Sequence, residues 1–450
     1  MSATVGTARD DAVTPASRSA WPWLVALTAF VALVGAGSFR AAPSVLIEPL
    51  QDDFGWSRGT ISAAVMVNLI LYGLTSPFAA ALMDRFGMRV IVASALTLIA
   101  AGSGLTLFMT ESWQLILCWG VLVGLGAGSM ALAFVATVTN RWFVKRKGLV
   151  TGILTAGGAA GQLVFLPLLA WLADNHSWKS VSLTVSLAAL AVVPMVLVFL
   201  RNRPQDVGVT AYGAGEPGYP APPPAPAPGE VRGAGARTLR VLRRASRTRV
   251  FWLLAGTFAI CGASTNGLIG THFIPAAHDH GMAKTAAASL LALVGIFDIA
   301  GTIVSGWLTD RVDSRILLTV YYAGRGISLM FLPVLLTDHV HPPMLFFIIF
   351  YGLDWVATVP PTVALCRQHF GEDGAIVFGW VLASHQIGAG LVALSAGLAR
   401  DNLGSYDAAW YAAGGLCILA AGLSYLITRP DRATHSTTVR PLEPAVHPAS

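Results

Sequence analysis

The chain has 450 residues, of which 55% are hydrophobic and only 12% are charged, and its formal net charge is +6. Its mean hydropathy is +0.65. Soluble domains carry about twice this share of charged residues, so the composition excludes an ordinary water-soluble globular protein. The basic residues stand beside apolar runs rather than in one patch, which argues against a nucleic-acid partner.

Twelve apolar runs follow one another along the chain. Each has about 20 residues or more, enough for a helix to span a hydrocarbon core of roughly 30 Å. The alternating segments of about ten residues that a membrane β-barrel needs are not present in the sequence. We therefore expect an all-α membrane protein with twelve transmembrane helices. The runs lie near residues 22–46, 59–82, 89–110, 113–138, 149–172, 179–200, 250–274, 286–308, 316–336, 341–364, 375–398 and 406–427.

The positive charges favour one orientation in the membrane. With the N-terminus in the cytoplasm, 23 of the 29 Lys and Arg residues fall on cytoplasmic segments, two fall within spans and four fall outside. This bias predicts that both termini are cytoplasmic. Residues 1–21 have no cleavable signal-peptide pattern, so we expect a cytoplasmic tail and a retained first span. The four external residues are Arg58, Lys179, Lys284 and Arg400.

Residues for enzymatic or metal chemistry do not cluster in the sequence. The four cysteines are far apart and lack metal-ligand spacing, so we expect them to be packing residues. There is no H-E-x-x-H motif, no phosphate-binding G-x-x-x-x-G-K-[ST] motif and no evident pair of nucleophile and base. The sequence predicts a protein that is not an enzyme and that uses no metal and no organic cofactor.

A charged cluster occurs twice, 226 residues apart. The first copy is "LMDRFGMRV" and the second is "GWLTDRVDSR". The offset recurs between Arg141 and Arg367, which predicts two copies of a six-helix unit at 22–200 and 250–428. Parallel repeats with a binding site between them are typical of secondary transporters. The cluster residues are Asp84, Arg85, Arg89, Asp310, Arg311 and Arg315.

These clusters resemble the loop signature of the major facilitator superfamily, G-x-L-x-D-R-x-G-x-R. Ala80 replaces the first glycine in one copy, and Asp313 replaces the later glycine in the other. The resemblance implies two pseudo-symmetric six-helix bundles, and it implies that the six cluster residues act as a latch for the outward-facing state. The alternative is a basic topology anchor, but an anchor has no need for Asp84 and Asp310.

Residues 201–249 form a predicted cytoplasmic linker. Its centre, "EPGYPAPPPAPAPGE", predicts a semi-extended, disordered spacer. Its basic end, "RTLRVLRRASRTR", predicts a short interfacial helix on anionic headgroups, with about 1 kcal/mol available for each Arg. We expect residues 429–450 to be a disordered cytoplasmic tail.

The stretch "WFVKRKGLVTGILTAGGAAG", residues 142–161, resembles the helix 4 to 5 signature of the monocarboxylate transporter family. Residues 49–62 and 201–213 also resemble bacterial members of this family and the related oxalate–formate antiporters. We expect the small residues Gly148, Gly152, Gly157, Gly158 and Gly161 to allow close approach of a neighbouring helix. The signature positions that fit are Trp142, Phe143, Lys145, Arg146, Lys147, Gly152 and Gly157.

The same resemblance implies a transport site around helices 1, 7, 8 and 10. In the family, an Asp in helix 8 contacts protons and an Arg four residues later binds the carboxylate. Here Asp298 occupies the acid position, but Thr302 stands where the Arg is expected. Ser44 likewise replaces the helix 1 Lys of animal members. The usual substrate cation is therefore missing.

Ionisable residues within the spans are candidates for function because an unpaired charge at the bilayer centre costs several kcal/mol. Arg40 in helix 1 is a candidate substrate cation, or else a snorkelling residue near the outer surface. Asp298 lies near the middle of helix 8, where a buried carboxyl is able to bind and release a proton. His385 in helix 11 is either a proton relay or substrate ligand, or a packed, hydrogen-bonded histidine.

Four further polar residues have two interpretations each. Arg325 in helix 9 and Asp354 in helix 10 are either a buried structural ion pair, which we favour, or substrate ligands. Asn68 and Tyr72, one turn apart on helix 2, either line the cavity or hold helices together.

Together these features predict a secondary transporter that carries a small organic anion, with a monocarboxylate as the favoured class, together with a proton by alternating access. The alternatives are an oxalate–formate type antiporter, an exporter of another small molecule, and a transporter-like membrane sensor. The expected partners are the organic anion and the lipid bilayer, with no obligate protein partner. The richness in Ala and Gly, with more Arg than Lys, suggests the inner (plasma) membrane of a bacterium of high genomic GC content.

Overall fold

The computed structural model of the protein describes residues 19–130, 132–216 and 228–428. Within these ranges the regular structure is helical apart from one isolated β-bridge between Phe143 and Tyr212. The predicted Pro-Ala spacer lies mostly outside the described residues, as do the predicted tails except for their innermost residues.

The first half of the chain forms six passes. The fourth pass contains a π-helical segment, Ile116–Val123, between α4 and α5. The helices are α1 (Trp21–Phe54), α2 (Arg58–Phe86), α3 (Met88–Leu105), α4 (Ser112–Leu115), α5 (Gly124–Ser129), α6 (Leu132–Trp142), α7 (Lys147–Asn175) and α8 (Trp178–Phe199).

The second half repeats this arrangement after the linker helix α9 (Pro228–Ala245). Its first pass contains the π-helical segment Ala263–Ile269. The helices are α10 (Arg249–Gly262), α11 (Gly270–Asp279), α12 (Lys284–Thr309), α13 (Ser314–Leu335), α14 (Pro342–Asp354), α15 (Val359–Phe370), α16 (Gly374–Leu403) and α17 (Asp407–Tyr425).

The number of membrane passes agrees with the prediction. Eleven stretches of the described chain are long and apolar enough to cross a membrane. One of them, Pro342–Leu403, has 62 residues, which is long enough for more than one crossing. It contains α14 and α15 as one pass and α16 as the next. The predicted fold of twelve spans is therefore confirmed.

Two helices differ from the expected ranges. α1 continues past the apolar run to Phe54 and ends at Gly55, whose φ of 67° suits glycine and whose N–H donates to Gln51 O. The tenth span is broken between Asp354 and Val359 rather than continuous. Pro360 and Pro361, at the start of α15, explain the break because proline lacks an N–H group and clashes with a preceding helical turn.

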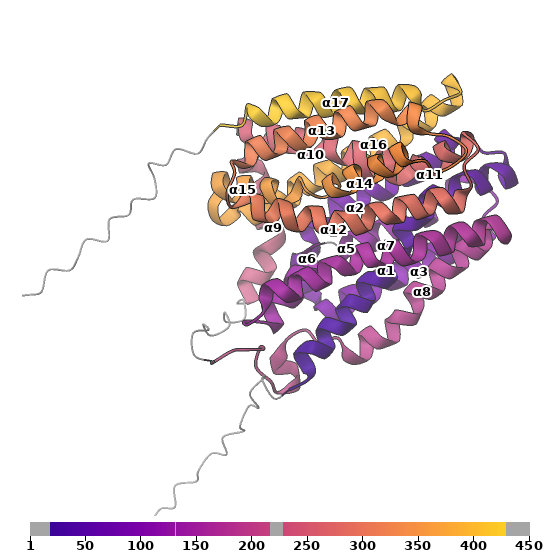
Figure 1. Cartoon of the computed structure of the whole chain (residues 1–450). Coiled ribbons are helices and arrows are strands. Elements are labelled where there is room, and N and C mark those ends of the chain that lie inside the picture. The colour runs from indigo at the N-terminus through magenta and orange to yellow at the C-terminus, as the bar shows by residue number, and fades with distance from the viewer. Residues whose placement is uncertain (1–18, 131, 217–227, 429–450) are drawn as a thin grey trace, which may run out of the picture.

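The two halves lie side by side in Figure 1, with the first half in indigo to magenta and the second in orange to yellow. α2 and α16 pack closely along the seam between them, and α7 packs against α12. Gly73, Gly390 and Gly397 allow the close approach of α2 and α16, since an added Cβ at each would lie within 3 Å of the opposite helix. Backbones can approach this closely only where side chains are absent.

The predicted role of the glycines on α7 is partly wrong. An added Cβ at Gly161 would lie 2.6 Å from Val34 O of α1, and one at Gly157 would lie 3.0 Å from the Phe30 ring, so these two do admit α1. No atom lies within 4 Å of a Cβ built at Gly148, Gly152 or Gly158. Their spacing places these three on the side of α7 that faces away from its neighbours.

The two ends of the linker are held differently: residues 201–216 bind to the first half, whereas α9 packs against both α2 of the first half and α16 of the second. Tyr212 N donates to Trp142 O at 2.8 Å and Val144 N donates to Tyr212 O at 2.9 Å, which ties residues 201–216 to the first half. A helix, α9, forms at the basic end and lies across the ends of the spans (Figure 1). Arg237 and Arg244 of α9 each pair with Asp373 at 3.2 Å. Contact of α9 with lipid headgroups stays a prediction.

The side of the molecule where α9 lies also holds the α2–α3 and α12–α13 connections. We call it the α9 end.

Candidate functional site

The repeat places two candidate residues at matching positions. Tyr72 and Asp298 are 226 residues apart, the same offset as Asp84 and Asp310. α2 and α12 are each uninterrupted between these positions, so the offset holds along both helices. Tyr72 and Asp298 therefore lie at the same depth in the two halves.

Arg40 is held by Tyr72. Its Nη2 donates to Tyr72 Oη at 2.7 Å, and its guanidinium carbon lies 5.4 Å from the centre of the Tyr72 ring. Tyr72 is buried, whereas Arg40 is exposed. Arg40 also acts electrostatically on His385 of α16, in the other half. Within the described ranges no ion pair joins Arg40 to a carboxylate, so its exposed guanidinium has no internal counter-ion there.

His385 packs at the contact between α10 and α16. Its ring centroid lies 4.8 Å from that of Phe258, and its backbone carbonyl lies so close to Gly262 that any Cβ there would overlap it. Its Nδ1 is buried and has no hydrogen-bond partner among the described residues. His385 is thus packed, as one interpretation expected, but among the described residues its Nδ1 does not supply the hydrogen bond that this interpretation also included.

Asp298 contacts the break between α14 and α15. Its Oδ1 accepts hydrogen bonds from Val356 N and from Thr302 Oγ1, each at 3.1 Å. Ser305 Oγ, two turns along α12, donates to Ala357 O at 2.5 Å. These side chains satisfy backbone groups that the break leaves without helical partners, which is needed for an interrupted helix at membrane depth. Thr302 therefore donates to the acid, and a contact of Thr302 with substrate stays a prediction.

Arg325 and Asp354 form the buried ion pair that we favoured. The Arg325 side chain is 0% exposed, its Nε lies 2.5 Å from Asp354 Oδ2, and its Nη2 donates to Asp354 O at 2.6 Å. Nη1 contacts Cys261 Sγ at 2.9 Å. Arg325 thus joins α13, the broken tenth span and α10. Cys261 was expected only to pack, and nothing in the sequence marks it as a polar contact of Arg325.

Asn68 does not belong to this group of residues. Its Nδ2 donates to Trp119 O at 2.8 Å, so it holds α2 to the π-helical segment of the fourth pass. This matches the helix-packing interpretation. Ser44, the substitute for the family lysine, bonds only to Ala41 O within its own helix.

The charged cluster of the first half is internally paired at the α9 end. Asp84 forms an ion pair with Arg141 of α6, rather than with Arg85 or Arg89. Arg89 N donates to Asn202 Oδ1 at 3.0 Å, and the Arg85 guanidinium lies 5.1 Å from the Phe86 ring centre. All of these contacts lie within the first half.

The cluster of the second half is arranged differently. Arg315 pairs with Asp313 at 2.6 Å, and Arg311 donates to Trp307 O at 3.0 Å, while Asp310 is exposed. In the part of the chain that the structure describes, none of the six cluster residues forms an ion pair with the other half. Their role as a latch stays a prediction.

The family signature forms the connection between α6 and α7. Trp142 and Phe143 are fully buried, and Phe143 packs edge-on against Trp23 with centroids 5.3 Å apart. Lys145 pairs with Glu216 of the linker at 2.7 Å. Arg146 has a φ of 61° at the start of α7, and Lys147 is the first residue of that helix. The signature therefore fixes a tight turn and anchors the linker.

Comparison with known proteins agrees with this architecture. The model of the Major Facilitator Superfamily matches residues 25–376 and again 265–448. The uncharacterized MFS-type transporter YcxA of Bacillus subtilis (strain 168) is 27% identical over 410 residues, which are 90% of this chain and 94% of that protein. Monocarboxylate transporter 13 of Bos taurus is 29% identical over 419 residues, covering 91% of this chain and 89% of that one.

A solved structure shows the same fold. The crystal structure of a D-xylose-proton symporter aligns with a TM-score of 0.68 at 13% identity, over 91% of this chain and 98% of the other. Two pseudo-symmetric bundles, the repeated charged cluster and the match to more than half of the chain all lead to one assignment. The chain belongs to the Major Facilitator Superfamily and is a multi-pass membrane transport protein.

Proposed function

We propose that this transporter carries a small organic anion, a monocarboxylate, together with a proton by alternating access. The observation that carries the proposal is the exposed Arg40 guanidinium, which Tyr72 holds and which forms no ion pair with a carboxylate within the described residues. The similarity to monocarboxylate transporter 13 supports this substrate class.

Arg40 supplies the cation that helix 8 lacks. A guanidinium presents a planar fork that binds a carboxylate through two parallel hydrogen bonds. The bond from Nη2 to Tyr72 fixes the orientation of this fork and leaves its other donors for the substrate. His385 of α16, on which the Arg40 charge acts, is then a candidate in the opposite half for a second substrate contact.

Asp298 supplies the proton site. As a carboxylate it accepts the N–H of Val356, and a charged acceptor makes such a bond stronger. Protonation removes the charge and weakens the bond at the break between α14 and α15. Proton binding is in this way coupled to the tenth span, which is the one span in the described part of the second half that a non-helical turn interrupts.

Uptake by proteoliposomes tests the proposal. Lactate, pyruvate, acetate, oxalate and formate are offered with and without an imposed proton gradient, and we expect gradient-driven accumulation of at least one monocarboxylate. Exchange without a response to the gradient would instead support an oxalate–formate type antiporter. Absence of flux for all solutes in either direction would contradict transport of these anions and favour a sensor.

Replacement of Arg40 should weaken substrate binding specifically. We expect Arg40→Ala to raise the KM for the transported anion by about 10- to 100-fold, since a hydrogen bond to a charged group contributes about 1.5 to 3 kcal/mol. Arg40→Lys keeps the charge but loses the fork, and should give an intermediate KM. Lys179→Ala, which removes an exposed cation at the start of α8, is the matched control. An unchanged KM in Arg40→Ala would place the substrate elsewhere.

We further propose that the α9 end faces the cytoplasm of a bacterial cell, with the protein in the inner membrane. The distribution of Lys and Arg supports this orientation. In intact cells, a membrane-impermeant thiol reagent should label a cysteine at Asp174, at the end of α7, but not one at Arg247, after α9. The opposite labelling pattern would reverse the orientation.

A further inference from the structure

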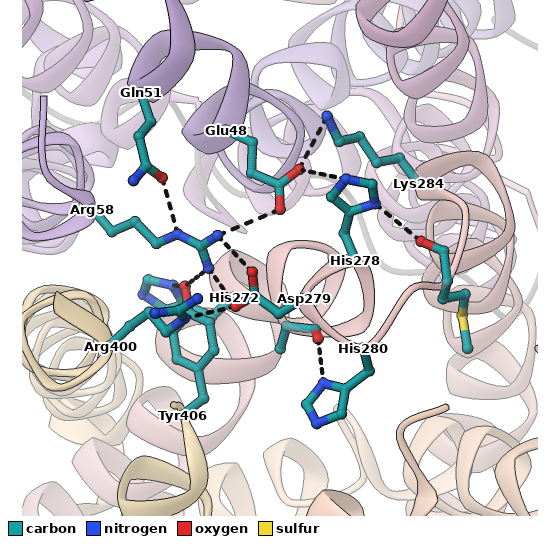
Figure 2. Close-up of polar contacts among 12 residues, drawn as sticks. Glu48, Gln51, Arg58, His272, His278, Asp279, His280, Lys284, Arg400 and Tyr406 are labelled. Carbon is teal, nitrogen blue, oxygen red and sulfur yellow. Dashed lines mark hydrogen bonds and ion pairs between the residues drawn. The ribbon is translucent and has the colours of Figure 1, made fainter. Parts of the chain in front are cut away.

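A network of charged side chains joins the two halves at the end of the molecule opposite α9 (Figure 2). We call it the seam network, and it comprises Glu48, Arg58, Asp279, Lys284 and Arg400, which are labelled in Figure 2, together with Asp401, which is not. Glu48 comes from α1 and Arg58 from α2, whereas the others come from α11, α12 and α16. The members are far apart in sequence, so their contacts depend on how the two halves meet.

Arg58 makes the first connection across the seam. Its Nη1 and Nη2 donate to the two carboxylate oxygens of Asp279, each at 2.8 Å. Nη1 also donates to Tyr406 Oη at 3.1 Å, and Nε donates to Gln51 Oε1 at 3.1 Å. The Arg58 side chain is only 7% exposed. A bidentate pair shielded from water is among the stronger ionic contacts in proteins.

Asp279 is held in place from its own half. Arg400 Nε donates to Asp279 Oδ2 at 2.8 Å, so two arginines share this carboxylate. Burial raises the pKa of Tyr406 to about 12, so its hydroxyl stays neutral and adds a hydrogen bond without adding charge. Asp279 is therefore presented to Arg58 by a fixed group of neighbours in the second half.

Glu48 makes the second connection. Its carboxylate lies 3.0 Å from Lys284 Nζ of the second half and 3.6 Å from Arg58 Nη2 of its own half. His278 Nε2 lies 3.8 Å away. Arg58 and Lys284 are 226 residues apart and are the first residues of α2 and α12. The repeat thus brings an equivalent cation from each half to the same acid.

Asp401 makes the third connection, to the backbone. Its Oδ1 accepts from Arg58 N at 3.1 Å and its Oδ2 accepts from Gly59 N at 2.7 Å. These are unpaired N–H groups of the first turn of α2, where the helix dipole also favours a negative charge. The start of α2 is thereby docked on the end of α16 in the other half.

We propose that the seam network is an ionic latch that keeps the end opposite α9 closed in this state, and that it opens when the transporter faces that side. Three acidic and three basic side chains meet there, and each connection has partners in both halves. At the α9 end, by contrast, the charged clusters are paired within their own halves in the described chain. Contacts that exist in one state alone shift the population toward that state.

A distance measurement between the halves tests the latch. Cysteines at Asp174 and Val340 are exposed, lie at the end of the seam network and belong to different halves. They can be spin-labelled because the four native cysteines are buried. The closed state should give a short distance between the two labels and the open state a long one. In lipid nanodiscs without substrate, the parent protein should give mainly the short distance. Arg58→Gln and Asp401→Asn should each raise the ratio of long to short distances by about tenfold or more.

Two further variants separate the latch from loss of folding. Asp338→Asn removes an exposed ion pair with His339 inside one half and should leave the distances unchanged. Arg58→Asp combined with Asp279→Arg restores opposite charges and should recover part of the short population. If Arg58→Gln and Asp401→Asn both give the same distances as Asp338→Asn, the latch is wrong. Because no substrate is present, this outcome is independent of the proposed substrate class.

Discussion

Asp354→Ala is expected to lower the free energy of unfolding of the second half by about 3 to 5 kcal/mol, because it leaves a buried guanidinium unpaired. Arg325 is fully buried, and Asp354 supplies both its carboxylate partner and a carbonyl acceptor. The alanine variant keeps the carbonyl but removes the counter-charge. The temperature at which the protein in detergent loses its monodisperse peak on size-exclusion chromatography measures the effect.

A double variant isolates the charge from the packing. Arg325→Met with Asp354→Leu replaces the pair by apolar side chains of similar volume, and should recover most of the lost stability. Asp338→Ala removes an exposed carboxylate and should behave like the parent protein. If Asp354→Ala were as stable as the parent protein, Arg325 would have to find another partner that the structure does not show.

Asp298→Asn is expected to abolish proton-driven accumulation while leaving exchange of substrate across the membrane intact. For one proton per anion, a gradient of one pH unit sustains about tenfold accumulation, since each unit corresponds to about 1.4 kcal/mol. The asparagine oxygen can still accept from Val356 N, so the break in the tenth span should be preserved. The accumulation ratio should therefore fall to about one, by loss of the proton site alone.

Asp298→Glu keeps a titratable group one methylene further along and should retain partial accumulation. Counterflow of labelled substrate, measured without a gradient, checks that the asparagine variant still transports. Full gradient-driven accumulation by Asp298→Asn would show that another group carries the proton, and His385 would be the next residue to test.

The fold followed from the sequence because the membrane imposes a simple rule on it. Every pass requires a long apolar run, and the repeated charged cluster reveals the two halves. The pairing of Arg325 with Asp354 could also be predicted from the sequence, because two single charges at similar depth in the membrane each need a partner. Contacts to Cys261 were not predictable, because a cysteine in an apolar run usually only packs.

The contacts of Asp298 depend on a feature that was overlooked. The apolar run 341–364 predicts a continuous tenth helix, and a continuous helix would leave no unpaired backbone N–H in its middle for Asp298 to bind. Pro360 and Pro361 carried the signal for the break. Helix packing is the default interpretation for Tyr72 in the sequence, and only its contact with Arg40 shows that it orients a cation.

The seam network could not be predicted from the sequence, for a different reason. Glu48, Asp279 and Asp401 stand at or near the ends of spans, where charged residues are ordinary in any membrane protein. Arg58 and Asp279 are brought together only by the docking of two halves that a single sequence does not place relative to each other. The offset of 226 residues between Arg58 and Lys284 was the one available clue.

The two bundles meet at glycines where α2 packs against α16. Where Gly73, Gly390 and Gly397 meet the opposite helix, one side of each contact is backbone alone, so no side chain of these residues interlocks with the other bundle. In the alternating-access cycle proposed above, a contact of this kind would let one bundle rotate against the other with little change in local shape. It would also stay the same in relatives whose residues around Arg40 differ with the solute they carry.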